Sequence, residues 1–361
     1  SVLIRDLKPV VANILKQECL SIGAECALHE HSITHKVDKT HAVIMATEEQ
    51  FRRLTKNLQI QPFGLSQMGK ELERLLFTPS NTHLHLARGQ SLDLSEKTAV
   101  MGILNLTPDS FSDGGTYFSR DQALKRAEEM VREGADIVDI GGESTRPGAE
   151  AVSEAEELDR VIPVVEFLAG TVSLISVDTT KPAVAEAALK AGAHIINDIF
   201  GFHQSPDLAR IAANYRAGVI LMHIKGTPRT MQKNPLYDDL MGEISDWLAE
   251  SIKIAEKAGL PRENLVVDPG IGFGKTLEHN LEILRRLGEL ACLKVPILIG
   301  TSRKSFIGKI DGSHVTNRLG GSLAAAVISV LNGAAIVRVH DVKETVQALR
   351  IVDAIKRDNH D

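Results

Sequence analysis

Residues 98–361 repeat one alternating pattern along their length. Short runs rich in β-branched residues alternate there with amphipathic stretches of helical periodicity, and eight such pairs can be counted. The runs are nearly all apolar, which is typical of parallel strands covered on both faces. We expect strands over residues 99–105, 137–140, 174–178, 195–198, 219–222, 265–268, 297–300 and 335–339. Eight strand–helix pairs predict an α/β fold, the (β/α)8 TIM barrel.

Helix start and stop signals support the same prediction. Ser153 and Glu156 have the spacing of a capping box, and Pro182 stands where a first helical residue would. Gly192 follows a helical stretch, where the left-handed backbone that ends many helices costs glycine least. These signals fall between the expected strands, as a barrel of repeated βα units requires.

Residues 1–95 have a different pattern. Helical periodicity covers 7–21, 48–58 and 69–76, and an apolar run covers 41–46. We expect a small α/β N-terminal domain over 1–95, joined through a polar linker at 78–96 to a barrel domain over 96–361. Its histidines lack a cysteine or acidic partner at a recognised metal-ligand spacing, so we interpret them as surface or hydrogen-bonded residues. The sequence assigns this domain no function beyond packing or dimer stabilisation, with regulation as an alternative.

Composition and charge narrow the range of partners. The chain has 361 residues, and its 41 Lys and Arg against 47 Asp and Glu give a formal net charge of −6. This balance gives no bulk attraction to nucleic acid or to an anionic membrane, so an anionic substrate needs a local basic pocket. The three cysteines are sparse, and no run approaches the roughly 20 apolar residues of a membrane span. We therefore expect a cytoplasmic protein that acts on small molecules.

Polar residues stand where the expected strands end. In a barrel of this kind the carboxyl ends of the strands and the loops after them build the active site. Asp178, Asn197 and Asp268, with Lys304, mix donors and acceptors that suit a flat heterocycle bearing amino and oxo groups. A second group of residues can bind a doubly charged oxyanion such as diphosphate, with a metal ion between protein and anion. This group consists of Asn105, Arg146, Arg338 and His340.

Each of these residues also has an ordinary structural explanation. An Asp at a strand end often caps the next helix, and a single Arg or Lys often forms a surface ion pair. Chance would scatter such residues over the barrel, whereas here eight strand ends carry polar side chains at one face. The stretch Gly270-Ile-Gly-Phe-Gly-Lys275-Thr276 is not a nucleotide P-loop, because its first glycine is one residue too close to Gly-Lys-Thr.

Several motifs in order resemble one known family. They are Asn105-Leu-Thr-Pro-Asp-Ser-Phe-Ser-Asp-Gly-Gly115, Gly142-Glu-Ser-Thr-Arg-Pro-Gly148, Asp268-Pro-Gly-Ile-Gly-Phe-Gly-Lys275, Ser302-Arg-Lys-Ser-Phe306 and Arg338-Val-His-Asp341. With them, residues 97–361 resemble dihydropteroate synthase, the pterin-binding barrel enzyme of folate biosynthesis and target of sulfonamides. The resemblance implies a transferase that condenses 6-hydroxymethyl-7,8-dihydropterin diphosphate with p-aminobenzoate to give 7,8-dihydropteroate and diphosphate. It also implies Mg2+ as cofactor and a homodimer.

The resemblance implies a role for each site residue. The pterin would be bound by Asp178, Asn197, Met222, Asp268, Phe273, Lys304 and Arg338. The diphosphate would be held by Asn105, Thr145, Arg146, Arg338 and His340, with Asn105 also ligating Mg2+. The p-aminobenzoate would contact Phe111, Thr145, Pro147 and Ser302. The catalytic set would be Asp113, Arg146, Lys304, Arg338 and His340.

The chemistry expected from these roles is a dissociative substitution. Diphosphate leaves well once a metal ion and arginines take its charge, and its departure leaves a methylene cation conjugated with the pterin. We expect Asp113 to stabilise that cation while the loops exclude water.

Two alternatives stay open at this point. A methyltetrahydrofolate:corrinoid methyltransferase shares the pterin-binding barrel, although it has no need for Arg146, Lys304 with Ser302, or the Arg338 and His340 pair. A non-catalytic pterin-binding homologue would bind pterin without Mg2+-dependent affinity for diphosphate. The Ile224 position, where the family commonly has Met, is a tolerable apolar replacement.

Overall fold

The chain divides into two compact units, Ser1–Pro79 and Ser80–Asp361. The computed structural model describes residues 1–357 apart from 35, 78–81, 107–119, 145–151 and 171–173. For Arg120 and Arg357 it describes the backbone alone. Each unit has its own hydrophobic core, so the two are described separately.

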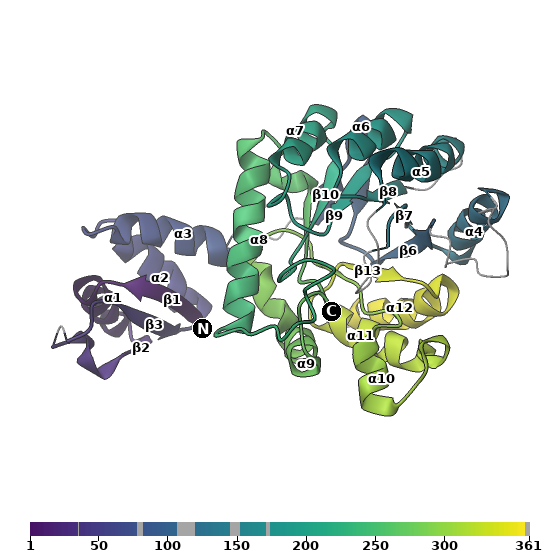
Figure 1. Cartoon of the computed structure of the whole chain (residues 1–361). Coiled ribbons are helices and arrows are strands. Elements are labelled where there is room, and N and C mark those ends of the chain that lie inside the picture. Colours follow the sequence, from purple (N-terminus) through teal and green to yellow (C-terminus); the bar gives the residue numbers. More distant parts are fainter. Residues whose placement is uncertain (35, 78–81, 107–119, 145–151, 171–173, 358–361) are drawn as a thin grey trace. The chain divides into compact units, whose positions relative to one another are not determined.

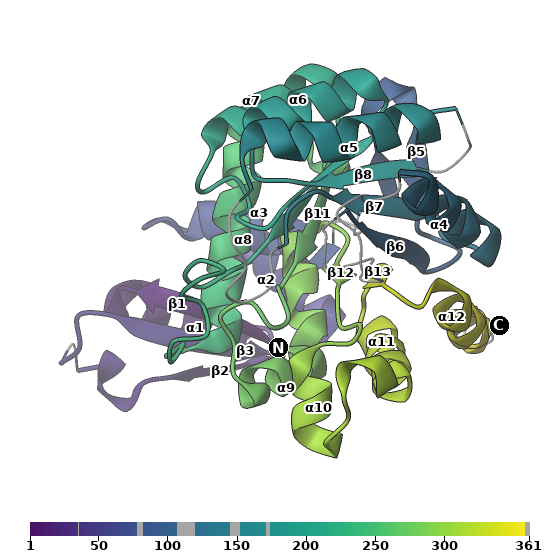
Figure 2. The ribbon, with the colours of Figure 1, turned by 45° about the vertical axis from the view of Figure 1, so that its right-hand side comes forward.

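The second unit is built on one eight-stranded parallel sheet (Figure 1, Figure 2). Its strands are β6 (Ala99–Asn105), β7 (Ile137–Gly141), β8 (Leu174–Asp178), β9 (Ile195–Asp198), β10 (Gly218–Met222), β11 (Leu265–Asp268), β12 (Leu298–Ile299) and β13 (Ile336–Val339). They are ordered β11-β10-β9-β8-β7-β6-β13-β12. A parallel bridge between Val267 and Ile297 joins the two ends. The sheet is thus a nearly closed barrel, and the TIM-barrel prediction is confirmed.

Helices follow the strands and cover the outside of the barrel. They are α4 (Arg120–Glu133), α5 (Glu154–Leu168), α6 (Pro182–Ala191), α7 (Pro206–Tyr215), α8 (Leu240–Lys257), α9 (Leu277–Arg286), α10 (Ser305–Asp311), α11 (Leu319–Leu331) and α12 (Val342–Arg357). The Ser153 side chain caps α5 by accepting from the Glu156 amide, and Pro182 begins α6. The Gly192 backbone, with φ +133°, ends α6. No described helix is long and apolar enough to cross a membrane.

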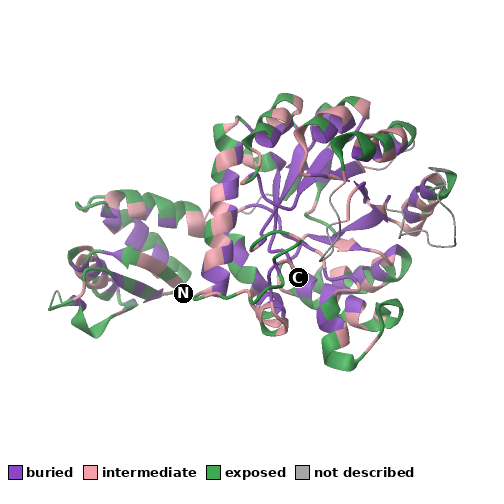
Figure 3. Ribbon diagram, viewed as in Figure 1, coloured by how far each residue is buried: buried purple, intermediate pink, exposed green. Residues whose placement is uncertain are grey.

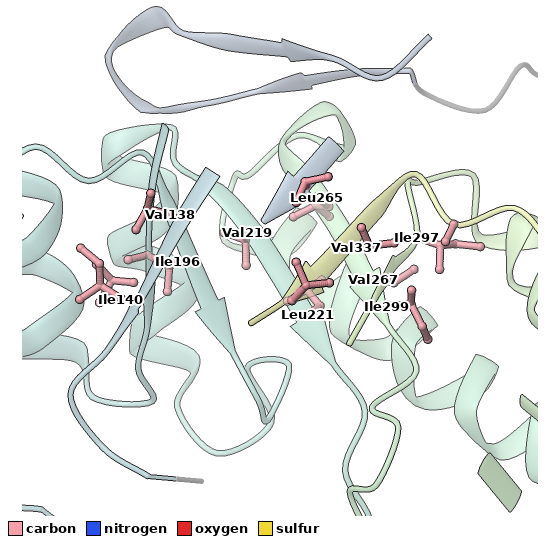
Figure 4. Close-up of a cluster of buried hydrophobic side chains, with 14 of the residues drawn as sticks. Val138, Ile140, Ile196, Val219, Leu221, Leu265, Val267, Ile297, Ile299 and Val337 are labelled. Atoms are coloured by element: carbon pink, nitrogen blue, oxygen red, sulfur yellow. The ribbon is translucent and has the colours of Figure 1, made fainter. Parts of the chain in front are cut away.

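The strands are apolar on both faces because both faces are covered. Side chains such as Val138 and Ile140 on β7 pack outward in the main core (Figure 4). The alternate residue Ile137 belongs to a separate interior cluster. Figure 3 shows the strands as almost continuously buried. A polar residue in the middle of such a strand therefore points either into this core or into the barrel interior.

A short hairpin closes the amino end of the barrel. It consists of β4 (His83–His85) and β5 (Ser91–Asp93), linked by the turn Ala87–Gly89. Leu84, Leu86 and Leu92 are buried against the interior residues of the barrel strands. We expected residues 78–96 to be a linker and the domain boundary to lie at 95. The structure instead divides the chain after Pro79, and this hairpin belongs with the barrel.

The first unit is a small α/β layer structure. Its antiparallel sheet has the order β1-β3-β2. Its elements are β1 (Val2–Leu7), α1 (Pro9–Ser21), β2 (Glu25–Leu28), β3 (Thr40–Met45), α2 (Glu48–Leu58) and α3 (Leu65–Phe77). A capping box between Thr47 and Gln50 begins α2. The expected helices and the 41–46 strand are present, whereas β1 and β2 were not predicted.

Candidate active site

The candidate site lies at the carboxyl ends of the barrel strands, where the sequence placed it. Because the strands are parallel, their last residues meet at one end of the barrel. The residues found at or near these ends are Asn105 on β6, Asp178 on β8, Asn197 on β9, Met222 on β10, Asp268 on β11 and Arg338 on β13. Lys304 directly precedes α10.

Arg338 connects two carboxylates across the barrel. Its Nε donates to Asp139 Oδ2 at 2.6 Å, and its Nη2 donates to Asp178 Oδ2 at 2.9 Å. The guanidinium side chain is 21% exposed and Asp139 is fully buried. Charge-assisted bonds in so dry a position fix the guanidinium plane far more firmly than surface ion pairs would.

Asn197 joins the same network. Its Nδ2 donates to Asp139 Oδ2 at 3.2 Å. Asp139 was not among the predicted residues, because a single acid inside an apolar run resembles an ordinary strand. Its alternation with the outward-packed Val138 and Ile140 was the available signal, since it places Asp139 on the interior face.

Burial controls the charge of the site carboxyls. It raises the pKa of Asp178 to about 7, although the Arg338 guanidinium acts in the opposite direction. Burial also raises the pKa of Asp268, against the effect of the Gly270 amide, which donates to Asp268 Oδ1 at 2.7 Å. These carboxyls are poised to accept N–H groups from a ligand that replaces their missing solvation.

Lys304 and Phe273 form one side of the site. The Lys304 Nζ lies 4.4 Å from the centroid of the Phe273 ring, and burial lowers the pKa of this lysine to about 8. Phe273 packs with the apolar residues Ile199, Phe200, Met222, Ile224 and Met231. A flat apolar surface beside convergent polar groups is the usual make-up of a heterocycle site.

The loop after β11 depends on glycine for its close approach to β10. Gly270 has φ +70°, and a Cβ atom there would overlap the carbonyl oxygen of His223. Behind Phe273, the buried Lys275 Nζ contacts His223 Nδ1 at 2.9 Å and donates to the Phe273 carbonyl at 2.9 Å. The glycine-rich motif is therefore a tightly packed strand-end turn.

His340 and Ser302 meet at the end of β13. The His340 Nδ1 lies 3.0 Å from Ser302 Oγ, and the His340 amide donates to the same hydroxyl at 3.2 Å. Burial and the neighbouring Arg338 lower the pKa of His340 to about 3, so its imidazole is neutral at physiological pH. Arg303 is held beside them through its Nε, 3.0 Å from Asp341 Oδ2.

A cavity of about 320 Å³ opens beside Asp178. It is lined by Glu143, Ser144, Glu157, Asp178, Thr179, Thr180, Ile199, Phe200, Gln204, Thr227, Pro228 and Arg229. Of the predicted site residues that the structure describes, Asp178 lines this cavity, and the others lie at the same end of the barrel outside its lining. The remaining predicted residues, Phe111, Asp113, Thr145, Arg146 and Pro147, lie outside the described residues.

Fold and site together define a barrel enzyme that binds a flat, polar heterocycle. Residues 101–340 match the family model described as pterin binding enzyme. The chain is 53% identical to the Escherichia coli (strain K12) dihydropteroate synthase over 269 residues, which cover 74% of this chain and 95% of that protein. The chain therefore belongs to the dihydropteroate synthase family of pterin-binding enzymes, and it is a transferase of folate biosynthesis.

Solved structures agree with this assignment. The Yersinia pestis dihydropteroate synthase with a sulfonamide drug complex is 51% identical, with a TM-score of 0.72, covering 76% of this chain and 99% of that one. The Xanthomonas albilineans enzyme with 4-aminobenzoic acid is 44% identical, with a TM-score of 0.71, covering 77% and 99%.

A further relative extends over the first unit. A Halobacterium salinarum protein named as a probable bifunctional folylpolyglutamate synthase/dihydropteroate synthase is 44% identical over 350 residues. The match covers 96% of this chain and 42% of that protein. The first unit is thus shared with a longer relative.

Proposed function

We propose that this chain condenses 6-hydroxymethyl-7,8-dihydropterin diphosphate with p-aminobenzoate, using the residues assembled at the carboxyl end of its barrel. The observation that carries the proposal is Arg338, held between Asp139 and Asp178 and beside Asn197. This arrangement presents carboxylate, amide and guanidinium groups toward one ligand. Neither a methyltransferase nor a non-catalytic pterin-binding protein is favoured by any observation here.

The pterin is bound by groups of complementary hydrogen-bonding character. Asp178, Asn197 and Asp268 offer acceptors for the amino and ring N–H groups, and Lys304 offers a donor for the oxo or ring-nitrogen side. The Phe273 ring and the Met222 side chain cover the faces of the heterocycle, with the Arg338 guanidinium against the ring. The buried carboxyls regain stabilisation when the ligand's N–H groups reach them.

The diphosphate lies toward Arg338 and His340. Arg338 can reach it while staying paired to Asp178, and the neutral His340 can donate a hydrogen bond from Nε2 because its Nδ1 faces the Ser302 hydroxyl. Thr145 and Arg146, on the sequence evidence, complete this grip. Together these groups stabilise the leaving group as its charge develops.

Asn105 is suited to hold Mg2+ beside the diphosphate. Its side-chain oxygen is a hard ligand at the end of β6, beside Gly141 of the neighbouring strand β7. Mg2+ is commonly bound through one or two protein oxygens together with substrate phosphates. Within the described residues, no cluster of three His, Cys, Asp or Glu forms an all-protein metal cage. When bound, the ion would neutralise charge on the departing diphosphate.

The substitution is dissociative in this proposal. Departure of diphosphate leaves a methylene cation conjugated with the pterin. The amine of p-aminobenzoate then forms the new C–N bond, and its proton passes to the released diphosphate or to water. Asp113 stabilises the cation, and Phe111, Thr145, Pro147 and Ser302 position p-aminobenzoate. The bound 4-aminobenzoic acid of the Xanthomonas albilineans relative supports this substrate.

We extend the proposal to a cytoplasmic homodimer. The outward faces of α11 and α12 carry Ile328, Leu331, Ile351 and Ile355, of which Ile351 is 62% exposed. These helices are neighbours, and exposed apolar side chains on adjacent helices are what a second copy commonly covers. The free cysteines fit a reducing compartment.

Turnover tests the proposed function directly. Purified protein is incubated with the pterin diphosphate, p-aminobenzoate and Mg2+, and dihydropteroate and diphosphate are separated by chromatography. We expect product only when all three are present. Pterin binding without product would contradict the synthase assignment. A single-copy mass at micromolar concentration would contradict the dimer.

A further inference from the structure

Asp139 is placed where it can act on two ligand-binding residues at once. It lies in the middle of β7, is fully buried, and accepts from Arg338 Nε at 2.6 Å and from Asn197 Nδ2 at 3.2 Å. Both bonds end on the same oxygen, Oδ2. The other oxygen, Oδ1, is buried and has no hydrogen-bond partner among the described residues.

The Asp139 carboxylate fixes the orientation of the Asn197 side-chain amide. A carboxylate paired to a guanidinium offers only lone pairs, so it can face the amide nitrogen of Asn197 but not its oxygen. The Asn197 Nδ2 has two protons, and one of them goes to Asp139. The second Nδ2 proton and the Oδ1 acceptor therefore face the ligand, and the two cannot exchange places by rotation of the amide.

We infer that Asp139 is a positioning residue that sets the specificity of the site for 2-aminopterins by locking the Asn197 amide. The inference deepens the proposed function and rests on it. A pterin carries an amino donor at C2 beside a ring-nitrogen acceptor at N1. This pair complements the Oδ1 acceptor and the free Nδ2 proton of Asn197. A lumazine, its 2-oxo analogue, carries an acceptor beside an N1–H donor, which is the reverse order. A locked amide matches the first ligand and opposes the second.

Two substitutions of Asp139 distinguish the effect of its hydrogen-bond acceptor from the effect of its negative charge. In Asp139→Asn, Arg338 Nε still requires an oxygen at the Oδ2 position, so the new amide turns its oxygen there and Asn197 stays oriented. In Asp139→Leu the acceptor is gone, and Asn197 can rotate to suit either ligand. Binding of 6-hydroxymethylpterin and of 6-hydroxymethyllumazine is measured by calorimetry for each protein at one pH near neutrality.

We expect the wild type to prefer the pterin by at least about a hundredfold, because a site built around fixed hydrogen bonds rejects the mismatched analogue. The Asp139→Asn protein should keep that ratio within about threefold, whereas Asp139→Leu should reduce it by at least about tenfold. Equal losses of both ligands in Asp139→Leu, with the ratio unchanged, would show a purely structural role and overturn the inference.

A control and a second variant keep the test decisive. Asp198 is a neighbouring buried carboxyl that accepts from the Phe200 and Phe202 amides and not from Asn197, so Asp198→Asn should leave the ligand ratio unchanged. If Asp139→Leu does not fold, Asp139→Ala replaces it, since a water in the vacated space can present either a proton or a lone pair. A wild type that binds both ligands equally overturns the inference without any variant. A wild type that binds neither points instead to failure of the proposed function.

Discussion

The Nη2 of Arg338 lies 2.9 Å from Asp178 Oδ2 while its Nε is bonded to Asp139. A lysine could satisfy only one of these carboxylates, because its ammonium is a single point charge and not a planar fork. We expect Arg338→Lys to lower kcat/KM by about a hundredfold, or about 2.7 kcal/mol. Steady-state kinetics with both substrates varied would measure this. A variant within threefold of the wild type would show that the double pairing is not required.

The raised pKa of Asp178 makes a stability prediction. The folded protein holds this proton up to about pH 7, whereas the ordinary value is 3.8. The folded state therefore binds more protons between these values, so the contribution of Asp178 to stability is largest below pH 4 and declines as pH rises toward 7. Denaturant unfolding at several pH values should show Asp178→Asn gaining stability relative to the wild type as pH rises. The same substitution at the exposed Asp159 is the control for a general effect of removing one acidic side chain. Identical pH trends for the two variants would refute the assignment.

Lys304 predicts a second pH effect, on ligand binding. Its pKa is lowered to about 8 by burial, so the unliganded protein loses the lysine's positive charge above that pH. The affinity for a dihydropterin should therefore weaken as pH rises above about 8. Lys304→Met keeps the packing on Phe273 and should lose the part of the pH dependence that lies above about 8, while the titrations of Asp178 and of the ligand itself remain. The same pH profile in both proteins would mean that Lys304 does not donate to the pterin.

Gly270 and Gly259 form a matched pair for testing the strand-end turn. Both have positive φ, of +70° and +91°, but a Cβ atom at Gly259 would meet nothing within 4 Å while one at Gly270 would overlap His223. Gly259→Ala should cost about 1 kcal/mol of unfolding free energy. Gly270→Ala should cost at least about 2 kcal/mol more and weaken pterin binding, because the Gly270 amide orients Asp268. Similar losses for both variants would contradict the close-packed turn.

Truncation distinguishes the boundary at Pro79 from the expected one at 95. A protein of residues 80–361 retains the β4–β5 hairpin and every described site residue, so it should fold and turn over substrate. A protein of residues 96–361 loses Leu84, Leu86 and Leu92 from the base of the barrel, which should cost several kcal/mol at about 2 to 5 kcal/mol per large apolar side chain. Thermal unfolding and turnover of both proteins would show which boundary gives a stable, active barrel. Equal stability of the two proteins would mean that the hairpin contributes little to the stability of the barrel.

Local sequence was sufficient for most of the barrel. Each strand is a short apolar run between polar turns, and the run keeps this pattern whatever lies beside it in space. The predicted strand at 195–198 and the helix begun by Pro182 are both present. Asp178, Asn197 and Asp268 were placed at the strand ends for the same reason, since parallel strands bring their carboxyl ends to one edge wherever the chain runs between them.

The hairpin and Asp139 were decided by tertiary structure. Leu84 and Leu86 alternate with His83 and His85, but such four-residue alternation in a polar stretch was interpreted as a linker. Only the open amino end of the barrel gives these leucines a place to be buried. Asp139 acquires its role from Arg338, which lies 199 positions away in sequence but whose Nε is 2.6 Å from Asp139 Oδ2 in the folded chain. Secondary structure follows from patterns among chain neighbours, whereas pKa values, amide orientation and ion pairing depend on distances that exist only after the barrel closes.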